Sequence, residues 1–288
     1  MIDAPAKSPV ADLPYLIRLL DDDSEPVRTA VAERLREVSN LLGGDFDREI
    51  ARQQIILTPA QARALRAFNS GRRRKEFAAA WPRWRSANNE FDQIENALGM
   101  LSDYLRGRRP GDGAAMRSAL DALGEAYLDA GSEPTVESLA AFLFGEGGRM
   151  RGNTLDYYAP ENSDLAWVID GGRGNPISLA CVFMLVGRRV GLRIHGCNYP
   201  GHFLARVELR GEVHLVDCFN GGTLTSAREL YRRYPMATEE VKALIDQRAP
   251  ALEIIARTLH NLEVAYTKRE EPDERRLAQD LIRLTLRP

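Results

Sequence analysis

Apolar and polar positions alternate at helical spacing over most of the chain, and at strand spacing only near its middle. Close to the N-terminus, residues 13–20 and 27–35 carry apolar side chains three or four positions apart. An acidic turn separates them, and it ends in Ser24, an expected helix N-cap, with Pro26 in the first turn of the second helix. The pattern predicts a helical hairpin over residues 1–45. Because one such pair cannot bury its own apolar face, we expect it to pack on the next helical segment of the chain.

Residues 46–131 continue the helical pattern. Apolar side chains from Phe77 to Tyr104 recur at spacings of three, four and seven, which predicts a buried stripe. Pro82 lies inside this stretch and predicts a kink or a break there. The basic run 72–75 precedes two tryptophans and is similar to a nucleic-acid patch, but the tryptophans share the apolar spacing. We therefore interpret residues 72–75 as a solvated basic turn beside core aromatics.

The pattern changes over residues 132–234. Residues 177–186 are apolar nearly all the way round, which predicts a helix buried on every side. Three strand-like runs come next, 192–198, 202–209 and 212–218, and a tight turn at Arg210-Gly211 joins the last two. Residues 235–288 return to helices, with two apolar stripes on either side of a turn at 270–273. The predicted fold class is α+β and mostly helical.

Composition narrows the function classes. The chain has 39 Lys and Arg residues against 41 Asp and Glu, a formal charge of -2, which gives no support for steering toward nucleic acid or an anionic membrane. No apolar run approaches the ~20 residues that span a bilayer. The N-terminus lacks the pattern of a signal peptide, and 3 cysteines are too few for a disulfide framework. We expect a cytoplasmic protein with no nucleic-acid or membrane partner; its oligomeric state is left open.

The tight turn also fixes a strand register. Pairing Leu209 with Glu212 places His202 diagonal to Asp217 on one face of the hairpin, within reach of an imidazole–carboxylate contact. A carboxylate bonded to one ring nitrogen fixes the tautomer and leaves the other nitrogen able to act as a base. The register therefore predicts a His202–Asp217 dyad, and the alternative is a buried histidine held by a structural carboxylate.

Several sequence blocks in this region stand in the order found in one bacterial family. They are Asp156-Tyr157-Tyr158, Asn162-Ser163-x-Leu165, Arg173-Gly174-x-Pro176-Ile177-Ser178-Leu179, Pro200-Gly201-His202-Phe203-Leu204 and Asp217-x-Phe219-x-Gly221-Gly222. Together they resemble the SirB-type transglutaminase-like family over about residues 136–234. The C-terminal helices resemble the tetratricopeptide-like tail of that family, and the N-terminal hairpin resembles a single HEAT repeat. The resemblance implies a papain-like core over residues 132–234, with a buried central helix on a small antiparallel sheet, and a helical tail at 235–288. The apolar spacing predicts a further helical region at 46–131.

The resemblance also implies a thiol nucleophile at the start of the central helix. His202 and Asp217 match the other two members of the triad, but the cysteine position falls at Pro176, after Asn175. Proline offers no nucleophile. Ser178 is a weak candidate, because its hydroxyl should turn to another side of the helix and bond the backbone. Of the cysteines, Cys181 lies in the apolar helix, where a thiol is inert, and Cys197 and Cys218 are interpreted as packing residues.

No cofactor or metal is predicted. His195 with Cys197, and His214 with Cys218, share strand parity and would suit zinc, but the C-x-x-C and H-x-x-x-H spacings are lacking. The glycine-rich segment 171–174 lacks the Lys-Ser/Thr ending of a phosphate loop.

Three functions are consistent with these residues. The first is a protein without catalytic activity that acts as an interaction or regulatory module and binds protein or peptide. The alternative is a hydrolase or acyltransferase of the papain-like class, using the His202–Asp217 dyad with a non-standard nucleophile or an activated water. The third is a scaffold with a vestigial site, in which replacing His202 harms stability alone. The sequence favours the first, because Pro176 stands at the nucleophile position.

Overall fold

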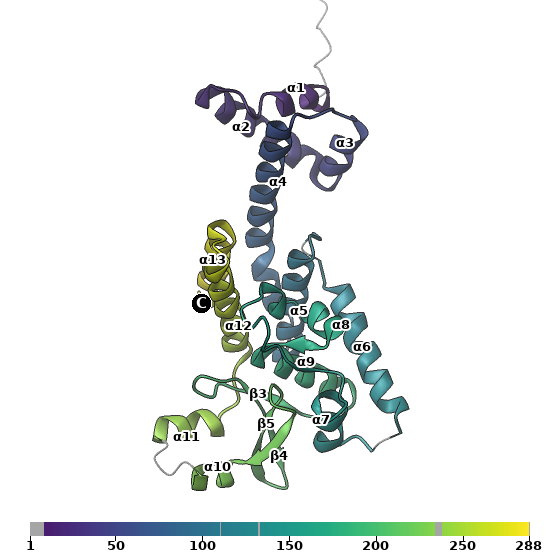
Figure 1. Cartoon of the computed structure of the whole chain (residues 1–288), viewed down its shortest axis with the longest axis vertical. Helices are drawn as coiled ribbons and strands as arrows, with labels where there is room; N and C mark the ends of the chain where they lie inside the picture. The colour runs from purple at the N-terminus through teal and green to yellow at the C-terminus, as the bar shows by residue number, and fades with distance from the viewer. Residues whose placement is uncertain (1–8, 110, 132, 234–237, 288) are drawn as a thin grey trace, which may run out of the picture. The chain divides into compact units, whose positions relative to one another are not determined.

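The computed structural model describes residues 9–109, 111–131, 133–233 and 238–287 (Figure 1). The chain forms two compact units, Met1–Glu76 and Phe77–Pro288. Each unit has its own hydrophobic cluster or clusters, so the two are described in turn.

The first unit consists of short helices around one apolar cluster. Its elements are η1 (Pro9–Asp12), α1 (Leu13–Arg18), α2 (Glu25–Leu42), η2 (Gly43–Asp45), α3 (Phe46–Arg52) and the first part of α4 (Pro59–Ala80). Apolar side chains of the α1–α2 hairpin share a cluster with Phe46 and Leu65 from α3 and α4. The prediction that the hairpin packs on the next helical segment is therefore confirmed.

The basic run 72–75 lies within α4, so its interpretation as a solvated turn is wrong. One of the four cations, Arg72, is largely buried. Its side chain is only 9% exposed and its guanidinium pairs with Asp47 at 2.7 Å and with Glu76 at 2.9 Å. Carboxylates contributed by α3 and by the next turn of α4 thus compensate the charge.

The second unit contains most of the helices and the main sheet. Its helices are η3 (Trp81–Ser86), α5 (Glu90–Leu105), α6 (Ala114–Asp129), α7 (Val136–Phe144), η4 (Pro160–Ser163), α8 (Leu165–Gly171), α9 (Pro176–Arg189), α10 (Ala227–Arg233), α11 (Glu239–Asp246), α12 (Ala251–Lys268) and α13 (Pro272–Leu286). The α-helical run stops at Ala80, and Pro82 lies in the 3-10 turn η3, so the predicted break is confirmed. Proline has no N–H to continue the helical ladder.

Four antiparallel strands form the main sheet in the order β3 (His195–Cys197), β4 (Leu204–Leu209), β5 (Glu212–Asp217) and β6 (Thr223–Ser226). Leu209 pairs with Glu212, as the tight turn predicts. The sequence pattern did not indicate β6. Two further strands, β1 (Arg151–Gly152) and β2 (Arg173–Gly174), form a parallel pair.

The core of the second unit is α9. Every residue from Pro176 to Gly187 is buried, and this helix contacts β3 and β4 on one side and α6, α7 and α8 on others. Figure 1 shows α9 among these elements, with β3, β4 and β5 beside it. The predicted α+β class, mostly helical, with a buried helix on a small antiparallel sheet, is confirmed.

The C-terminal helices α12 and α13 pack against each other and against α5 and η3. Trp81 donates its indole N–H to the Thr285 hydroxyl at 2.8 Å, both buried, which ties η3 to α13. From α12, the Arg257 side chain reaches the loop before β4.

Candidate functional site

His202 and Asp217 contact each other directly. The His202 Nε2 atom lies 2.9 Å from the Asp217 Oδ1 atom. The two side chains are 24% and 26% exposed, so the pair is partly shielded from water. Because Asp217 engages Nε2, the Nδ1 atom is the nitrogen available to another group.

His202 reaches this position from a turn and not from a strand, which corrects the predicted strand 202–209. Strand β4 begins at Leu204, two residues later. Gly201 has a φ of +72°, a left-handed conformation that glycine adopts without steric cost, and the His202 N–H donates to the Tyr199 carbonyl at 3.1 Å. His202 therefore lies in the loop between β3 and β4, just before the chain enters β4.

Arg257 of α12 holds this turn. Its guanidinium donates to the carbonyl oxygens of His202 at 3.0 Å and Tyr199 at 3.4 Å, and to the Asn198 side chain at 3.4 Å. Its Cζ atom also lies 5.5 Å from the centre of the Phe203 ring. Burial lowers the pKa of Arg257. A desolvated cation bonded to two carbonyls of this turn fixes the backbone at His202 and before it.

Asp217 is anchored by the turn after β5. Its Oδ1 atom accepts from the backbone N–H groups of Phe219 at 3.2 Å and Asn220 at 3.1 Å, and its Oδ2 atom accepts from the Asn220 side chain at 2.9 Å. Burial raises the pKa of Asp217, but the hydrogen bonds from His202 and Asn220 outweigh it, so the net pKa is lowered. The carboxylate therefore stays ionised and oriented toward the imidazole.

Phe219 connects the dyad to the start of α9. Its ring meets the His202 ring edge-on, with the centroids 6.3 Å apart. A Cβ atom on Gly152 would lie 2.7 Å from the Phe219 ring, so the ring rests on bare backbone. Gly152 pairs with Gly174, two residues before Pro176. The dyad is thus linked to the helix start through one aromatic ring and one pair of glycines.

No nucleophile is positioned at the start of α9. Asn175 caps the helix by accepting from the Ser178 N–H at 2.9 Å, and the buried Pro176 is the first helical residue. The Ser178 hydroxyl is buried and donates to the Asn175 carbonyl at 3.0 Å. This backbone bond is the arrangement expected for a structural serine.

The three cysteines are free and buried. Burial raises the pKa of the Cys181 thiol to about 12, and that of Cys197 to about 11. Burial also raises the pKa of Cys218 well above its ordinary value, with a further increase from the Asp217 charge. Since the thiolate is the reactive form, these side chains are poor nucleophiles near neutral pH.

The residues of the zinc alternative are not arranged as a site. Within the described part of the chain, no three His, Cys, Asp or Glu side chains form a group that could hold a metal ion. Burial and the charges of Arg248, Arg206 and Arg193 lower the pKa of His195 to about 4. Cations beside an imidazole oppose binding of another cation. His214 bonds instead to the Glu212 carbonyl, 3.1 Å from Nδ1.

Two features of the site were missed by sequence reasoning. The first is the role of Arg257, which lies 55 positions from His202 in the chain and carries no local signal. The second is an exposed aromatic surface formed by Tyr157, 44% exposed, and Tyr158, 47% exposed, with the 83% exposed Leu155 two positions before Tyr157 in the chain. The Tyr157 ring lies 5.2 Å from the Tyr158 ring and 6.1 Å from the Phe219 ring, measured between centroids, so this surface adjoins the dyad.

A family comparison covers the part of the chain that contains His202 and Asp217. Residues 113–260, more than half of the chain, match the model of the transglutaminase-like superfamily, and the chain belongs to that superfamily. The match extends beyond residues 136–234 on both sides and includes Arg257.

Among curated proteins, a UPF0162 protein of Xylella fastidiosa (strain 9a5c) is 36% identical over 147 residues, which are 49% of this chain and 52% of the relative. A UPF0162 protein of Pseudomonas aeruginosa is 34% identical over 115 residues, 39% of this chain and 42% of the relative. F-box only protein 21 of Mus musculus is 32% identical over 72 residues, 25% of this chain and 12% of that protein. The chain thus spans about half the length of its bacterial relatives, or less. No solved structure gives a significant match. Among the described helices, none combines the length and the apolar character needed to cross a membrane.

Proposed function

We propose that this chain is a transglutaminase-like protein without catalytic activity that acts as a protein-interaction or regulatory module. One observation carries the proposal: the His202–Asp217 dyad is intact at 2.9 Å, while the helix start that should present a thiol carries Pro176. Buried cysteines with raised pKa values and a Ser178 hydroxyl bonded to backbone offer no replacement. We also infer that the core is of the SirB type, that the α12–α13 hairpin is tetratricopeptide-like and that the α1–α2 hairpin is HEAT-like.

The exposed aromatic surface beside the dyad supports a binding role. Large apolar side chains exposed as a group mark interaction surfaces, and tyrosine is enriched in them. Leu155, Tyr157 and Tyr158 form such a group, and Lys268 lies 5.6 Å from the centre of the Tyr158 ring. The partner that fits is a protein or peptide with aromatic or aliphatic side chains for the tyrosines and a carboxylate for Lys268.

Covalent probes test the lack of catalysis. The intact chain is incubated with an iodoacetamide probe and, separately, with a fluorophosphonate probe, and labelling is measured by mass spectrometry. We expect no stoichiometric labelling by either. Stoichiometric labelling of one residue that disappears in His202→Ala would overturn the proposal in favour of a hydrolase or acyltransferase.

Restoring a thiol provides the positive control. In Pro176→Cys we expect one cysteine that reacts with iodoacetamide faster than the three native thiols, because the helix N-terminus and His202 favour the thiolate. The acceleration should be lost when His202→Ala is added. Ser178→Cys is the matched control. Position 178 lies two residues further into α9, where the native hydroxyl bonds the backbone, so a thiol there should react slowly with iodoacetamide.

Photocrosslinking tests the binding surface. A benzoylphenylalanine at position 158 should yield a discrete crosslinked product with a cellular protein. The same group at Leu128, a comparably exposed position on α6 (48% exposed), should not. Equal crosslinking from both positions, or none from position 158, would count against this surface.

A further inference from the structure

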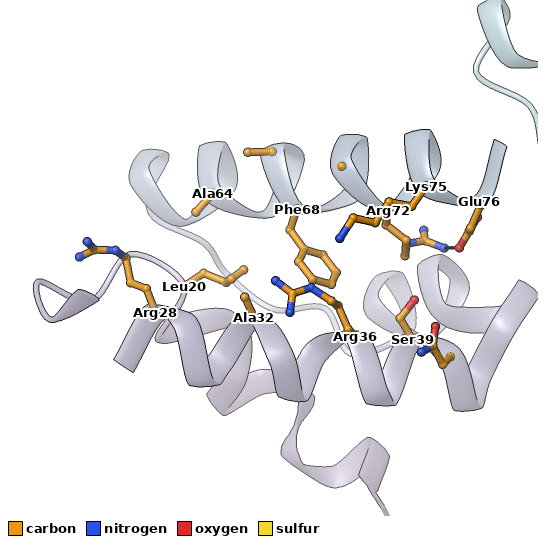
Figure 2. Close-up of a pocket in the computed structure, with 13 residues that line it drawn as sticks. Leu20, Arg28, Ala32, Arg36, Ser39, Ala64, Phe68, Arg72, Lys75 and Glu76 are labelled. Atoms are coloured by element: carbon orange, nitrogen blue, oxygen red, sulfur yellow. Dashed lines mark hydrogen bonds and ion pairs between the residues drawn. The ribbon is translucent and has the colours of Figure 1, made fainter. Parts of the chain in front are cut away.

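The strongest unassigned feature lies in the first unit, away from the dyad. A groove of about 570 Å³ runs between α2 and α4, and every residue that lines it belongs to the first unit. This size falls in the range of binding cavities. Figure 2 shows Phe68 pointing from α4, and Arg36 from α2, into the space between the two helices.

Each helix presents one stripe of side chains to the groove. On α2 the stripe comprises Arg28, Ala32, Arg36, Ser39 and Asn40; on α4 it comprises Ala64, Ala67, Phe68, Gly71, Arg72, Lys75 and Glu76. Spacings of three and four positions keep each stripe on one helical face. The smallest of these side chains leave room for a backbone to approach closely, which is the requirement for a third helix packed on the first two.

The groove is basic although the chain as a whole is not. Arg28, Arg36 and Lys75 are cationic, and Arg72 and Glu76 form an ion pair with each other, whereas the net charge of the chain is -2. Arg28 donates to the carbonyl oxygens of Asp22 and Asp23, and its charge still lies at the groove edge. Charge complementarity therefore selects an acidic occupant.

Two buried polar groups in the groove lack partners. The Ser39 hydroxyl belongs to a residue only 3% exposed, and the Arg72 side chain is 9% exposed. Neither the Ser39 Oγ atom nor the Arg72 Nε atom has a hydrogen-bond partner among the described residues. Buried polar groups without partners cost free energy.

We propose that this groove binds an acidic amphipathic helix of a partner protein. The apolar face of that helix packs on Phe68 and the small residues of α4, and its carboxylates meet Arg36, Lys75 and the Ser39–Arg72 end. From Ala64 to Lys75 the groove extends about 17 Å along α4, at ~1.5 Å per residue, so the bound segment has roughly three turns. This is helix-in-groove recognition, in which the bound helix contacts the groove through side chains three, four and seven positions apart.

Panning of a phage-displayed library of 14-residue peptides on the full chain tests the proposal. We expect enriched peptides to combine apolar residues at helical spacing with an excess of Asp and Glu. Synthetic copies of these peptides should bind in fluorescence polarisation, with affinity falling as salt rises. No enrichment, or enrichment without acidic excess, would overturn the proposal.

Variants assign the binding to the groove. Arg36→Glu should weaken binding at least about tenfold, because it reverses a charge at the centre of the groove. Ala67→Trp should block binding by adding a bulky side chain to the lining of the groove. Arg66→Glu is the matched control, an equal charge change on an exposed residue of α4 outside the groove, and should leave the affinity within about twofold. Circular dichroism and thermal midpoints establish that each variant is folded.

Two results would contradict the assignment. The first is equal peptide affinity in Arg36→Glu and Arg66→Glu. The second is a wild-type dimer in sedimentation equilibrium that Arg36→Glu dissociates, which would make a second copy of the chain the occupant. Neither result bears on the dyad, which lies in the other unit.

Discussion

The Arg257 guanidinium donates a hydrogen bond to the carbonyl oxygen of His202, with 3.0 Å between Nη2 and O. The residue thus links α12 to the turn that carries the imidazole. His202 also contacts Asp217, from the end of β5. His202 is therefore held by α12 through its backbone carbonyl and by β5 through its imidazole.

Removal of the Arg257 guanidinium should loosen the His202 turn. We expect Arg257→Met to lower the free energy of unfolding by about 1–3 kcal/mol, because three backbone and side-chain acceptors lose a charged donor. Urea denaturation measures the change, and the imidazole NMR signals of His202 should broaden. Arg276→Met is the control, since Arg276 is an exposed residue paired only within its own helix α13. An unchanged His202 signal in Arg257→Met would show that α12 does not hold the turn.

The lowered pKa of Asp217 predicts how stability depends on pH. A carboxyl group with a lower pKa in the folded state contributes stability above its unfolded pKa of about 4, and that contribution is lost as the pH falls through the folded pKa. Asp217→Asn should therefore be less stable than the wild type at pH 7, and the difference should shrink below about pH 4. Urea denaturation from pH 3 to pH 7 tests this. Asp280→Asn, which removes an exposed pair on α13, should show no such convergence.

Burial of all three cysteines predicts slow thiol chemistry. With the pKa of Cys197 at about 11, the thiolate fraction at pH 8 is on the order of one in a thousand, and it is lower for Cys181. We expect less than about 0.1 equivalent of label from a disulfide reagent in the native chain. Unfolding in guanidinium should release all three thiols. Rapid native labelling of any one cysteine would contradict this and would identify that thiol as a candidate nucleophile.

The contact between Gly152 and Phe219 predicts a steric effect. Gly152→Ala places a Cβ atom 2.7 Å from the ring, so the ring must move and the unfolding free energy should fall by about 1–3 kcal/mol. The His202 ring, 6.3 Å from Phe219 between centroids, should change its NMR shift. Gly171→Ala is the matched control, because a Cβ there meets nothing within 4 Å. Equal stability of the two variants would contradict the packing described.

Much of the fold follows from local patterns. Helical spacing locates the buried α9, Pro82 marks the end of α4, and Arg210-Gly211 sets the hairpin register. That register brings the start of β4 near Asp217, and the turn before β4 places His202 against the carboxylate. The position of Pro176 at the first residue of α9 follows in the same way, since proline is well suited to that position.

Other features depend on residues far apart in the chain. Arg257 and His202 belong to different elements, and only the packing of α12 against the rest of the unit brings them together. The local sequence of residues 72–75 predicts a solvated turn. In the structure Asp47 of α3 pairs with Arg72, a contact that the local sequence does not indicate. The basic groove likewise requires α2 and α4 to lie side by side (Figure 2).

The sequence by itself determined most of the helices, the hairpin register and the proline at the start of α9, because spacing and turn chemistry act over a few residues. The tertiary structure alone decided what holds the dyad, how deeply the thiols are buried and where a basic groove opens. Those properties depend on which distant side chains exclude water or contribute a charge, and no local pattern specifies that.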